Sequence, residues 1–130
     1  MGERKILIIE DDAPTIELYQ EIFKNSGLTT EIIVSGKEAM EKIHNIALGK
    51  DSPPKLVILD ILLPEVNGLE ILEDMRRYEL TGRLPVIILS NYSDVEAQKK
   101  ALALKAEKYI IKTQITPPEL LKLIKSRLGA

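Results

Sequence analysis

Five short apolar runs recur along the 130-residue chain, and a segment with helical periodicity follows each of them. Strands that are apolar throughout are typical of a parallel sheet covered on both faces, and the alternating helices supply its crossover connections. Because such crossovers are right-handed, the sheet becomes doubly wound. We therefore predict an α/β fold with a doubly wound, five-stranded parallel sheet. The predicted strands are KILII (5–9), TTEIIV (29–34), LVILD (56–60), LPVIILS (84–90) and KYIIK (108–112).

Residues that favour helix N-termini precede several of the predicted helices. The first helix is expected over residues 15–25, with Asp12 as a cap and Gly27 ending it. A Ser or Thr followed three residues later by Glu has the spacing of a capping box. The predicted pairs are Ser35 with Glu38, Ser93 with Glu96, and Thr116 with Glu119.

The composition argues against several classes of protein. The chain has no cysteine, so disulfides, thiolate metal sites and thiol nucleophiles are excluded. Lys plus Arg number 18 against 20 for Asp plus Glu, which gives no basic surface for nucleic acid or for an anionic membrane. No apolar run approaches the roughly 18–20 residues of a membrane span, and the N-terminus lacks a signal-peptide pattern. We expect a single cytoplasmic domain over residues 1–130.

One carboxylate ends the most apolar of the predicted strands. Asp60 follows the run LVIL, and burying an ionised carboxylate without a partner is costly. In an open parallel sheet the ligand site lies beyond the carboxyl ends of the strands, so Asp60 should face that crevice. Other predicted strands end at the same edge in polar residues, namely Glu10, Asp11, Ser90 and Lys112.

Carboxylates gathered in this way repel each other unless a cation neutralises them. Mg²⁺ suits such a group because it takes oxygen ligands, keeps several waters and accepts phosphate oxygens. A carboxylate beside Mg²⁺ can attack phosphorus and form an aspartyl phosphate, while the metal and a lysine neutralise the transferred oxygens. The residues therefore predict a Mg²⁺-assisted phosphoryl acceptor, with Asp60 as nucleophile, Lys112 as the cation and Ser90 as a hydrogen-bond donor.

Four stretches, in order and at strand ends, resemble the receiver domain of two-component response regulators. They are ILIIEDD, LVILDILLPEVNGLEIL, PVIILSNYSD and KYIIK, and the resemblance extends from Lys5 to Leu128. It implies the (βα)5 flavodoxin-like fold of the chemotaxis response regulator, with strand order 2-1-3-4-5. It also implies a phosphorylation-controlled signalling protein.

The resemblance assigns a role to each residue of the strand-end group. Asp11 would bind Mg²⁺ directly, Glu10 through water, and Asp60 would be both a metal ligand and the phosphorylated residue. The main-chain carbonyl of Leu62 would complete the protein's share of the coordination. The remaining matches are Ser90 as the switch hydroxyl, Lys112 as the phosphate-binding lysine and Tyr109 as the switch aromatic.

The family also implies the partners. The phosphoryl group would come from a histidine kinase or a histidine phosphotransfer protein, or from a small donor such as acetyl phosphate. We expect a phosphoacceptor that catalyses at most its own phosphorylation and dephosphorylation. Output would pass through residues 93–128 to an unknown effector or to an output domain outside this sequence. The domain would act as a monomer or as a phosphorylation-dependent dimer.

Two alternatives compete with this interpretation. An aspartyl phosphatase commonly carries a second aspartate two residues after its nucleophile, but Leu62 occupies that position. A pseudo-receiver, which binds partners without phosphorylation, stays open because Thr113 stands where the family usually has a proline joined by a cis peptide. A cis bond to a non-proline residue costs about 2.5–4 kcal/mol, so we expect a trans bond there. The single histidine, His44, is expected on a helix surface without a catalytic role.

Overall fold

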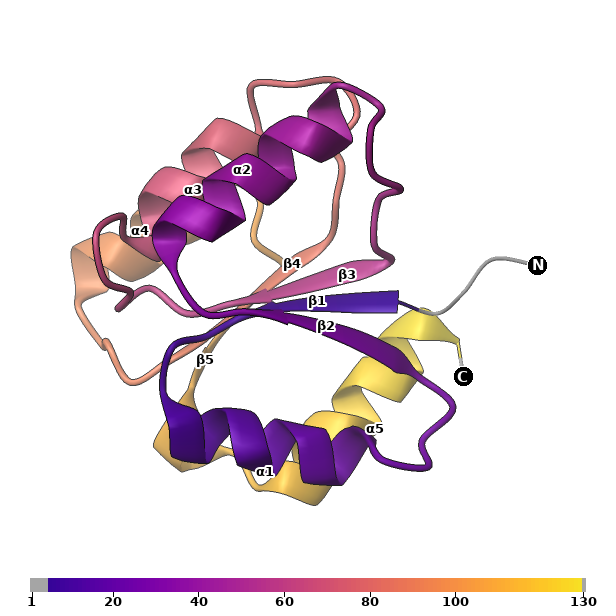
Figure 1. The fold of residues 1–130 in the computed structure, drawn as a ribbon. Helices are drawn as coiled ribbons and strands as arrows, with labels where there is room; N and C mark the ends of the chain where they lie inside the picture. The colour runs from indigo at the N-terminus through magenta and orange to yellow at the C-terminus, as the bar shows by residue number, and fades with distance from the viewer. Residues whose placement is uncertain (1–4, 130) are drawn as a thin grey trace.

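The chain folds into a five-stranded parallel sheet with helices on both faces (Figure 1). The computed structural model describes residues 5–129. The strand order is β2-β1-β3-β4-β5, and every neighbouring pair is parallel, which confirms the predicted fold class. The elements are β1 (Lys5–Ile9), α1 (Ala13–Phe23), β2 (Thr29–Ile33), α2 (Gly36–Ala47), β3 (Leu56–Leu59), α3 (Gly68–Met75), β4 (Val86–Ser90), α4 (Val95–Ala103), β5 (Lys108–Ile111), the 3-10 helix η1 (Lys112–Gln114) and α5 (Pro117–Leu128).

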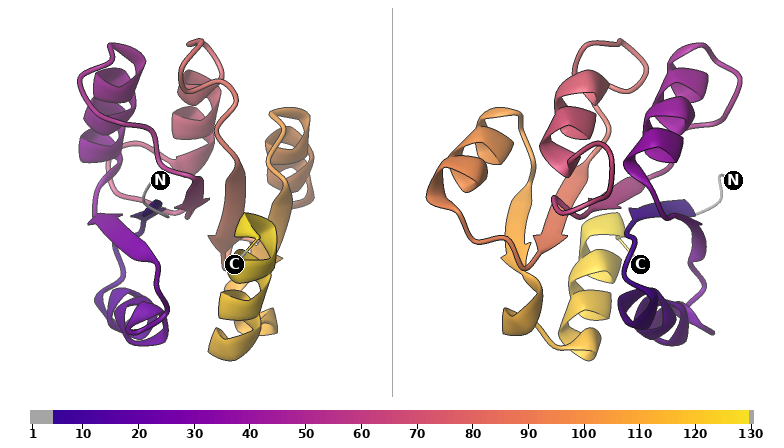
Figure 2. Two further views of the ribbon diagram at one scale, coloured as in Figure 1. Left: turned by 90° about the vertical axis from the view of Figure 1, so that its right-hand side faces the viewer. Right: turned by 60° about the vertical axis from the view of Figure 1, so that its left-hand side comes forward.

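The helices divide into two layers. Helices α1 and α5 cover one face of the sheet, and α2, α3 and α4 cover the other (Figure 1). Within the larger layer α3 lies between α2 and α4 (Figure 2). None of the helices within residues 5–129 has the length and apolar composition that crossing a bilayer requires.

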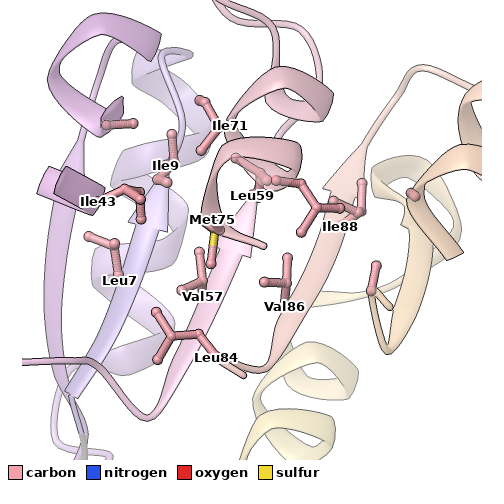
Figure 3. Packing of buried hydrophobic residues seen from close by; sticks show 14 of the residues in the cluster. Leu7, Ile9, Ile43, Val57, Leu59, Ile71, Met75, Leu84, Val86 and Ile88 are labelled. Atoms are coloured by element: carbon pink, nitrogen blue, oxygen red, sulfur yellow. The ribbon is translucent and has the colours of Figure 1, made fainter. Parts of the chain in front are cut away.

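Alternate residues of each strand enter two separate cores, as the two-residue period of a strand requires. Along β1, Leu7 and Ile9 join the cluster beneath α2 and α3, whereas Ile6 and Ile8 join the cluster beneath α1 and α5. The first cluster is drawn in Figure 3, where Ile43 of α2 and Ile71 of α3 pack over the strand side chains. Both faces of the central strands are therefore buried, which explains why their sequences are apolar throughout.

The helix boundaries follow the caps more closely than they follow the apolar pattern. Helix α1 begins at Ala13, two residues earlier than expected, because the Asp12 carboxylate accepts from the Thr15 N–H and Pro14 fits the first turn. It ends at Phe23, before Gly27 is reached. The predicted end at residue 25 is wrong because Asn25 has a φ of 62°, which a helix cannot contain.

The predicted caps of the later helices are confirmed except for one. Ser35 caps α2, and Thr116 forms a complete capping box with Glu119 at the start of α5. The proposed pairing of Ser93 with Glu96 is wrong, because Asp94 caps α4 and its carboxylate accepts from the Ala97 N–H at 3.0 Å.

The strand register places the expected site residues along one edge of the sheet. Ile9 of β1 is aligned with Leu59 of β3, so Glu10 and Asp60 both follow directly after the ladder. Strand β3 ends at Leu59, one residue before the predicted end, although the Asp60 N–H still donates to the Ile9 carbonyl at 3.1 Å. Lys112 likewise begins η1 instead of ending β5. Residues 5–129 contain no cis peptide, which confirms the trans bond expected at Thr113.

Candidate functional site

The carboxyl ends of β1 and β3 bring three acidic side chains together. Glu10, Asp11 and Asp60 each offer a carboxylate oxygen, and these atoms lie within 4.8 Å of one another. Glu10 and Asp60 are almost fully buried, at 1% and 5% exposed, while Asp11 is open to solvent. The sequence prediction that these residues converge is confirmed. The group has one open side, at Asp11, through which an ion could enter.

Lys112 reaches this group from the edge of the sheet. It follows β5, which β4 separates from β3, so its side chain must extend past the end of β4. Its ammonium Nζ lies 2.6 Å from Oε1 of Glu10 and 2.8 Å from Oδ2 of Asp60. One cation therefore bridges the two buried carboxylates, although 52 residues separate Lys112 from Asp60 in the sequence.

Burial and charge shift the pKa values of the bridged groups. Burial raises the pKa of Glu10 to about 7; the hydrogen bond from Lys112 opposes this shift, and the negative charge of Asp60 adds to it. Burial lowers the pKa of Lys112, but its hydrogen bonds to Asp60 and Glu10 outweigh that effect and leave the pKa raised. The ammonium thus stays charged, and one lysine does not fully compensate the buried acids.

The loop after β3 holds the Asp60 carboxylate in place. The Leu62 N–H donates to Oδ1 of Asp60 at 3.1 Å, while the Leu62 side chain is 54% exposed. The start of α3 lies behind this loop, where the Gly68 N–H donates to the Ile61 carbonyl at 2.9 Å. The role of the Leu62 main-chain carbonyl as a metal ligand stays a prediction.

The two expected switch residues meet at one loop residue. Ser90 is fully buried at the end of β4, and its hydroxyl accepts from the Tyr92 N–H at 3.2 Å. Tyr109 on β5 is half-buried, and its hydroxyl donates to the Tyr92 carbonyl. Their switching roles stay predictions, but the structure connects both side chains through the backbone of Tyr92.

Sequence reasoning missed two residues that shape the site. Gly68 packs against the backbone of Asp60, and Tyr92 links Ser90 to Tyr109. Asn67 is the cap of α3, and Gly68 is the first residue of that helix. The contact of Gly68 with Asp60 had no signal of its own. Tyr92 acts through its main chain, which no side-chain pattern can indicate.

The donor set fits a small divalent cation. Three carboxylates from adjacent strand ends supply only oxygen, which Mg²⁺ prefers, and Asp11 leaves room for water on the exposed side. Burial raises the pKa of Glu10 and the negative charge of Asp60 adds to that shift, so a cation bound beside the two carboxylates would favour their ionised forms. Lys112 and the buried Ser90 hydroxyl lie at the same edge of the sheet, where they could contact an anionic group bound beside the metal.

Comparison with known proteins places the whole chain in one family. Residues 6–125 match the family model described as response regulator receiver domain. The polar-differentiation response regulator DivK of Brucella ovis is 30% identical over 126 residues, covering 97% of each chain.

Solved structures give the same result. The CheY-like response regulator receiver domain protein from Methanospirillum hungatei JF-1 superimposes with a TM-score of 0.84 at 29% identity, covering 98% of this chain and 95% of that one. The phosphorylated cyanobacterial phytochrome response regulator RcpA gives a TM-score of 0.82 at 27% identity, covering 97% and 91%. The chain belongs to the receiver domain family of two-component response regulators, and it has the CheY-like fold of that family.

Proposed function

We propose that this receiver domain accepts a phosphoryl group on Asp60 in a Mg²⁺-dependent reaction. The observation that carries the proposal is the convergence of Glu10, Asp11 and Asp60 with the Lys112 ammonium bound between two of them. The acids would hold Mg²⁺, with Glu10 acting through water and the Leu62 carbonyl completing the set. Bound Mg²⁺ would offset the negative charge of the transferred phosphoryl oxygens. RcpA, a similar protein, was solved in a phosphorylated form.

Asp60 is the nucleophile in this proposal. One of its carboxylate oxygens attacks phosphorus, the bond from phosphorus to the donor breaks, and the donor keeps the bonding electron pair. The Leu62 N–H holds Oδ1 of Asp60, which fixes the orientation of the carboxylate before the attack. The donor would be a phosphohistidine of a histidine kinase or phosphotransfer protein, or a small acyl phosphate. The domain would catalyse its own labelling and hydrolysis and no other reaction.

Lys112 and Ser90 would bind the product. The Lys112 ammonium, held by Glu10 and Asp60 in the resting protein, would turn one N–H toward a phosphoryl oxygen. The Ser90 hydroxyl would donate to another. Because Ser90 is hydrogen-bonded to Tyr92, its movement would disturb the Tyr92–Tyr109 contact. A phosphate that binds one arrangement of these residues better than the other shifts the population of the two.

The output surface would be formed by α4, β5 and α5. Tyr109 lies on β5 beside α4, so a change in its packing reaches this surface directly. A phosphorylation-independent interaction module is the competing proposal, and it is disfavoured because the acids, the lysine and the hydroxyl are all present at the site.

Intact-mass measurement after incubation with acetyl phosphate tests the proposal. We expect one added phosphoryl group that requires Mg²⁺ and is prevented by a chelator. Asp60→Asn should remove the label, whereas Asp51→Asn, a matched change in the loop after α2, should keep it. A label that persists in Asp60→Asn would refute the assignment. A parent that takes no label from acetyl phosphate or from any kinase would favour the interaction module.

A further inference from the structure

Gly36, the first residue of α2, packs against the loop that follows Asp60. A Cβ atom placed on Gly36 would lie 2.4 Å from the carbonyl oxygen of Val66 and 2.7 Å from its Cβ atom. These atoms are part of the backbone or fixed to it, so they cannot rotate away as the end of a long side chain could. Any side chain larger than hydrogen at position 36 would therefore require either α2 or the loop to move.

Helix α2 is the better anchored of these two partners. Its buried face carries Ala39, Ile43 and Ile46, which are at most 1% exposed. Moving the helix would disturb the close packing of these side chains, which is costly. The loop over residues 61–67 is different, because four of its seven residues are exposed to solvent. Crowding at Gly36 should therefore displace the loop and leave the helix in place.

The tip of this loop is stiff, so a displacement of Val66 should not be absorbed locally. The Val66 N–H donates to the Pro64 carbonyl at 2.8 Å, and Glu65 between them has a φ of 70°. This hand of γ-turn is strained for a residue with a side chain, and such strain persists only where the surrounding contacts hold it. The proline ring also fixes the φ angle of Pro64. A push on Val66 should therefore pass along the chain toward Leu62.

Leu62 carries the hydrogen bond that orients the Asp60 carboxylate. Its N–H donates to Oδ1 of Asp60 at 3.1 Å. The base of the loop is held by Gly68, which packs against the Asp60 backbone, so a shift of the tip would change the angle and length of this bond. The Leu62 carbonyl, which is predicted to be a metal ligand, would move with it. Groups that orient metal ligands in this way affect metal affinity although they do not touch the ion.

We propose that Gly36 is a positioning residue for the metal site. Because it has no side chain, α2 approaches Val66 closely and holds the loop where the Leu62 N–H meets the Asp60 carboxylate. This contact between α2 and the loop thereby sets the affinity of the site for Mg²⁺. The part that concerns Mg²⁺ rests on the proposed function, whereas the position of the loop does not.

Hydrogen exchange in the metal-free protein, followed by NMR, tests the position of the loop. The Leu62 amide should exchange about fivefold faster in Gly36→Ala than in the parent, because its bond to Asp60 is weakened. Gly49→Ala is the matched control, just beyond the other end of α2. Gly49 has a φ of +76° with no atom within 4 Å of an added Cβ, so alanine there strains the backbone without touching the loop. A parent-like rate at Leu62 in Gly36→Ala would mean that the helix moves instead, which would overturn the proposal.

Calorimetric titration with Mg²⁺ tests the effect on the site. We expect folded Gly36→Ala to bind Mg²⁺ about tenfold more weakly than the parent, and Gly49→Ala to stay within about twofold of it. Both variants should be less stable than the parent, so equal Mg²⁺ affinities in all three proteins would show that Gly36 is merely structural. A parent that binds no Mg²⁺ would refute the proposed function, while the exchange rate of Leu62 would still decide the position of the loop.

The parent supplies the test if Gly36→Ala does not fold. Coupling between two places in a protein is reciprocal, so Mg²⁺ bound on one side of the loop must alter the contact with α2 on the other. Saturation with Mg²⁺ should shift the amide resonance of Gly36 and leave that of Gly49 unchanged. A Gly36 resonance that does not move at saturation would contradict the proposal.

Discussion

Gly68 packs directly against the main-chain carbonyl of Asp60. A Cβ atom placed on Gly68 would lie 2.1 Å from the Asp60 carbonyl oxygen and 2.9 Å from the Cα of Ile61. Both neighbours are backbone atoms and cannot rotate away as a side chain could. The first residue of α3 therefore limits where the Asp60 backbone can lie, and only glycine allows this approach.

Gly68→Ala should accordingly disturb both the fold and the metal site. We expect the free energy of unfolding to fall by about 1–3 kcal/mol, since overpacking forces the backbone to shift. Mg²⁺ affinity should fall by about tenfold because Asp60 is displaced with the loop. Urea titration and calorimetry measure the two effects.

Gly27→Ala is the control for this substitution. Gly27 has a φ of +82° with no atom within 4 Å of an added Cβ, so alanine there meets backbone strain alone. A loss of about 1–2 kcal/mol with unchanged Mg²⁺ affinity is expected. Parent-like Mg²⁺ affinity in Gly68→Ala would contradict the assigned contact.

Arg76 joins three segments on the opposite side of the fold from α1 and α5. Its guanidinium donates to the carbonyls of Leu104 at 2.8 Å, Leu84 at 2.9 Å and Gly82 at 3.1 Å. Arg76→Met should lower the free energy of unfolding by about 2–3 kcal/mol, because it leaves these carbonyls without their donor. Arg77→Met removes a 65% exposed side chain and should change stability by less than about 0.5 kcal/mol. Equal losses in urea titrations of the two variants would rule out this role for Arg76.

Periodicity was sufficient to predict the fold but not its boundaries. The apolar runs of β1 and β3 are continuous because both faces of each strand are covered, and that pattern, alternating with helical segments, is typical of a parallel sheet between two helical layers. The start of α4 could not be predicted in this way, because Ser93 and Asp94 are adjacent and both residue types are favoured as helix N-caps. The sequence cannot choose between them. In the structure it is Asp94 whose carboxylate reaches an open N–H of the first turn.

In the site, likewise, the residues at the strand ends could be predicted from the sequence, whereas the contacts made by loops could not. Glu10, Asp60 and Lys112 could be predicted because each directly follows an apolar run, and parallel strands bring those positions to one edge. The contact between Gly68 and Asp60 depends on the path of the loop between β3 and α3. The bond from Tyr109 to the Tyr92 carbonyl depends on another loop, and a carbonyl is present in every residue. No pattern of residue types encodes contacts of that kind.

The hydrogen bond from the Tyr109 hydroxyl to the Tyr92 carbonyl should restrain the loop after β4 against local opening. Tyr109→Phe removes this bond, and its loss near the surface should cost no more than about 1 kcal/mol. Amide exchange in the loop, at the Tyr92 N–H that donates to Ser90, should become about two- to fivefold faster. Hydrogen exchange followed by NMR measures this change, with the amides of α2 as the internal reference. An unchanged rate at Tyr92 would mean that Tyr109 does not restrain the loop.

The raised pKa of Glu10 predicts a pH dependence of stability in the metal-free protein. The carboxyl has a pKa of about 7 in the folded state, against the ordinary value of 4.5 that it regains on unfolding. Between these values the folded protein holds a proton that the unfolded chain has lost, so stability must fall as the pH rises through this interval. The contribution is fully present below about pH 4.5 and is gone above about pH 7.

Glu10→Gln isolates this effect, because glutamine does not titrate. With a chelator present, the stability of the parent relative to Glu10→Gln should fall from pH 5 to pH 8, by an amount on the order of 2 kcal/mol. Glu17→Gln, an exposed change on α1, should follow the parent profile. Saturating Mg²⁺ should reduce the fall, because a cation favours the ionised carboxylate and so opposes its protonation. Urea titrations at four pH values supply the comparison. Parallel curves for the parent and Glu10→Gln would show that burial of Glu10 does not hold a proton in the folded state.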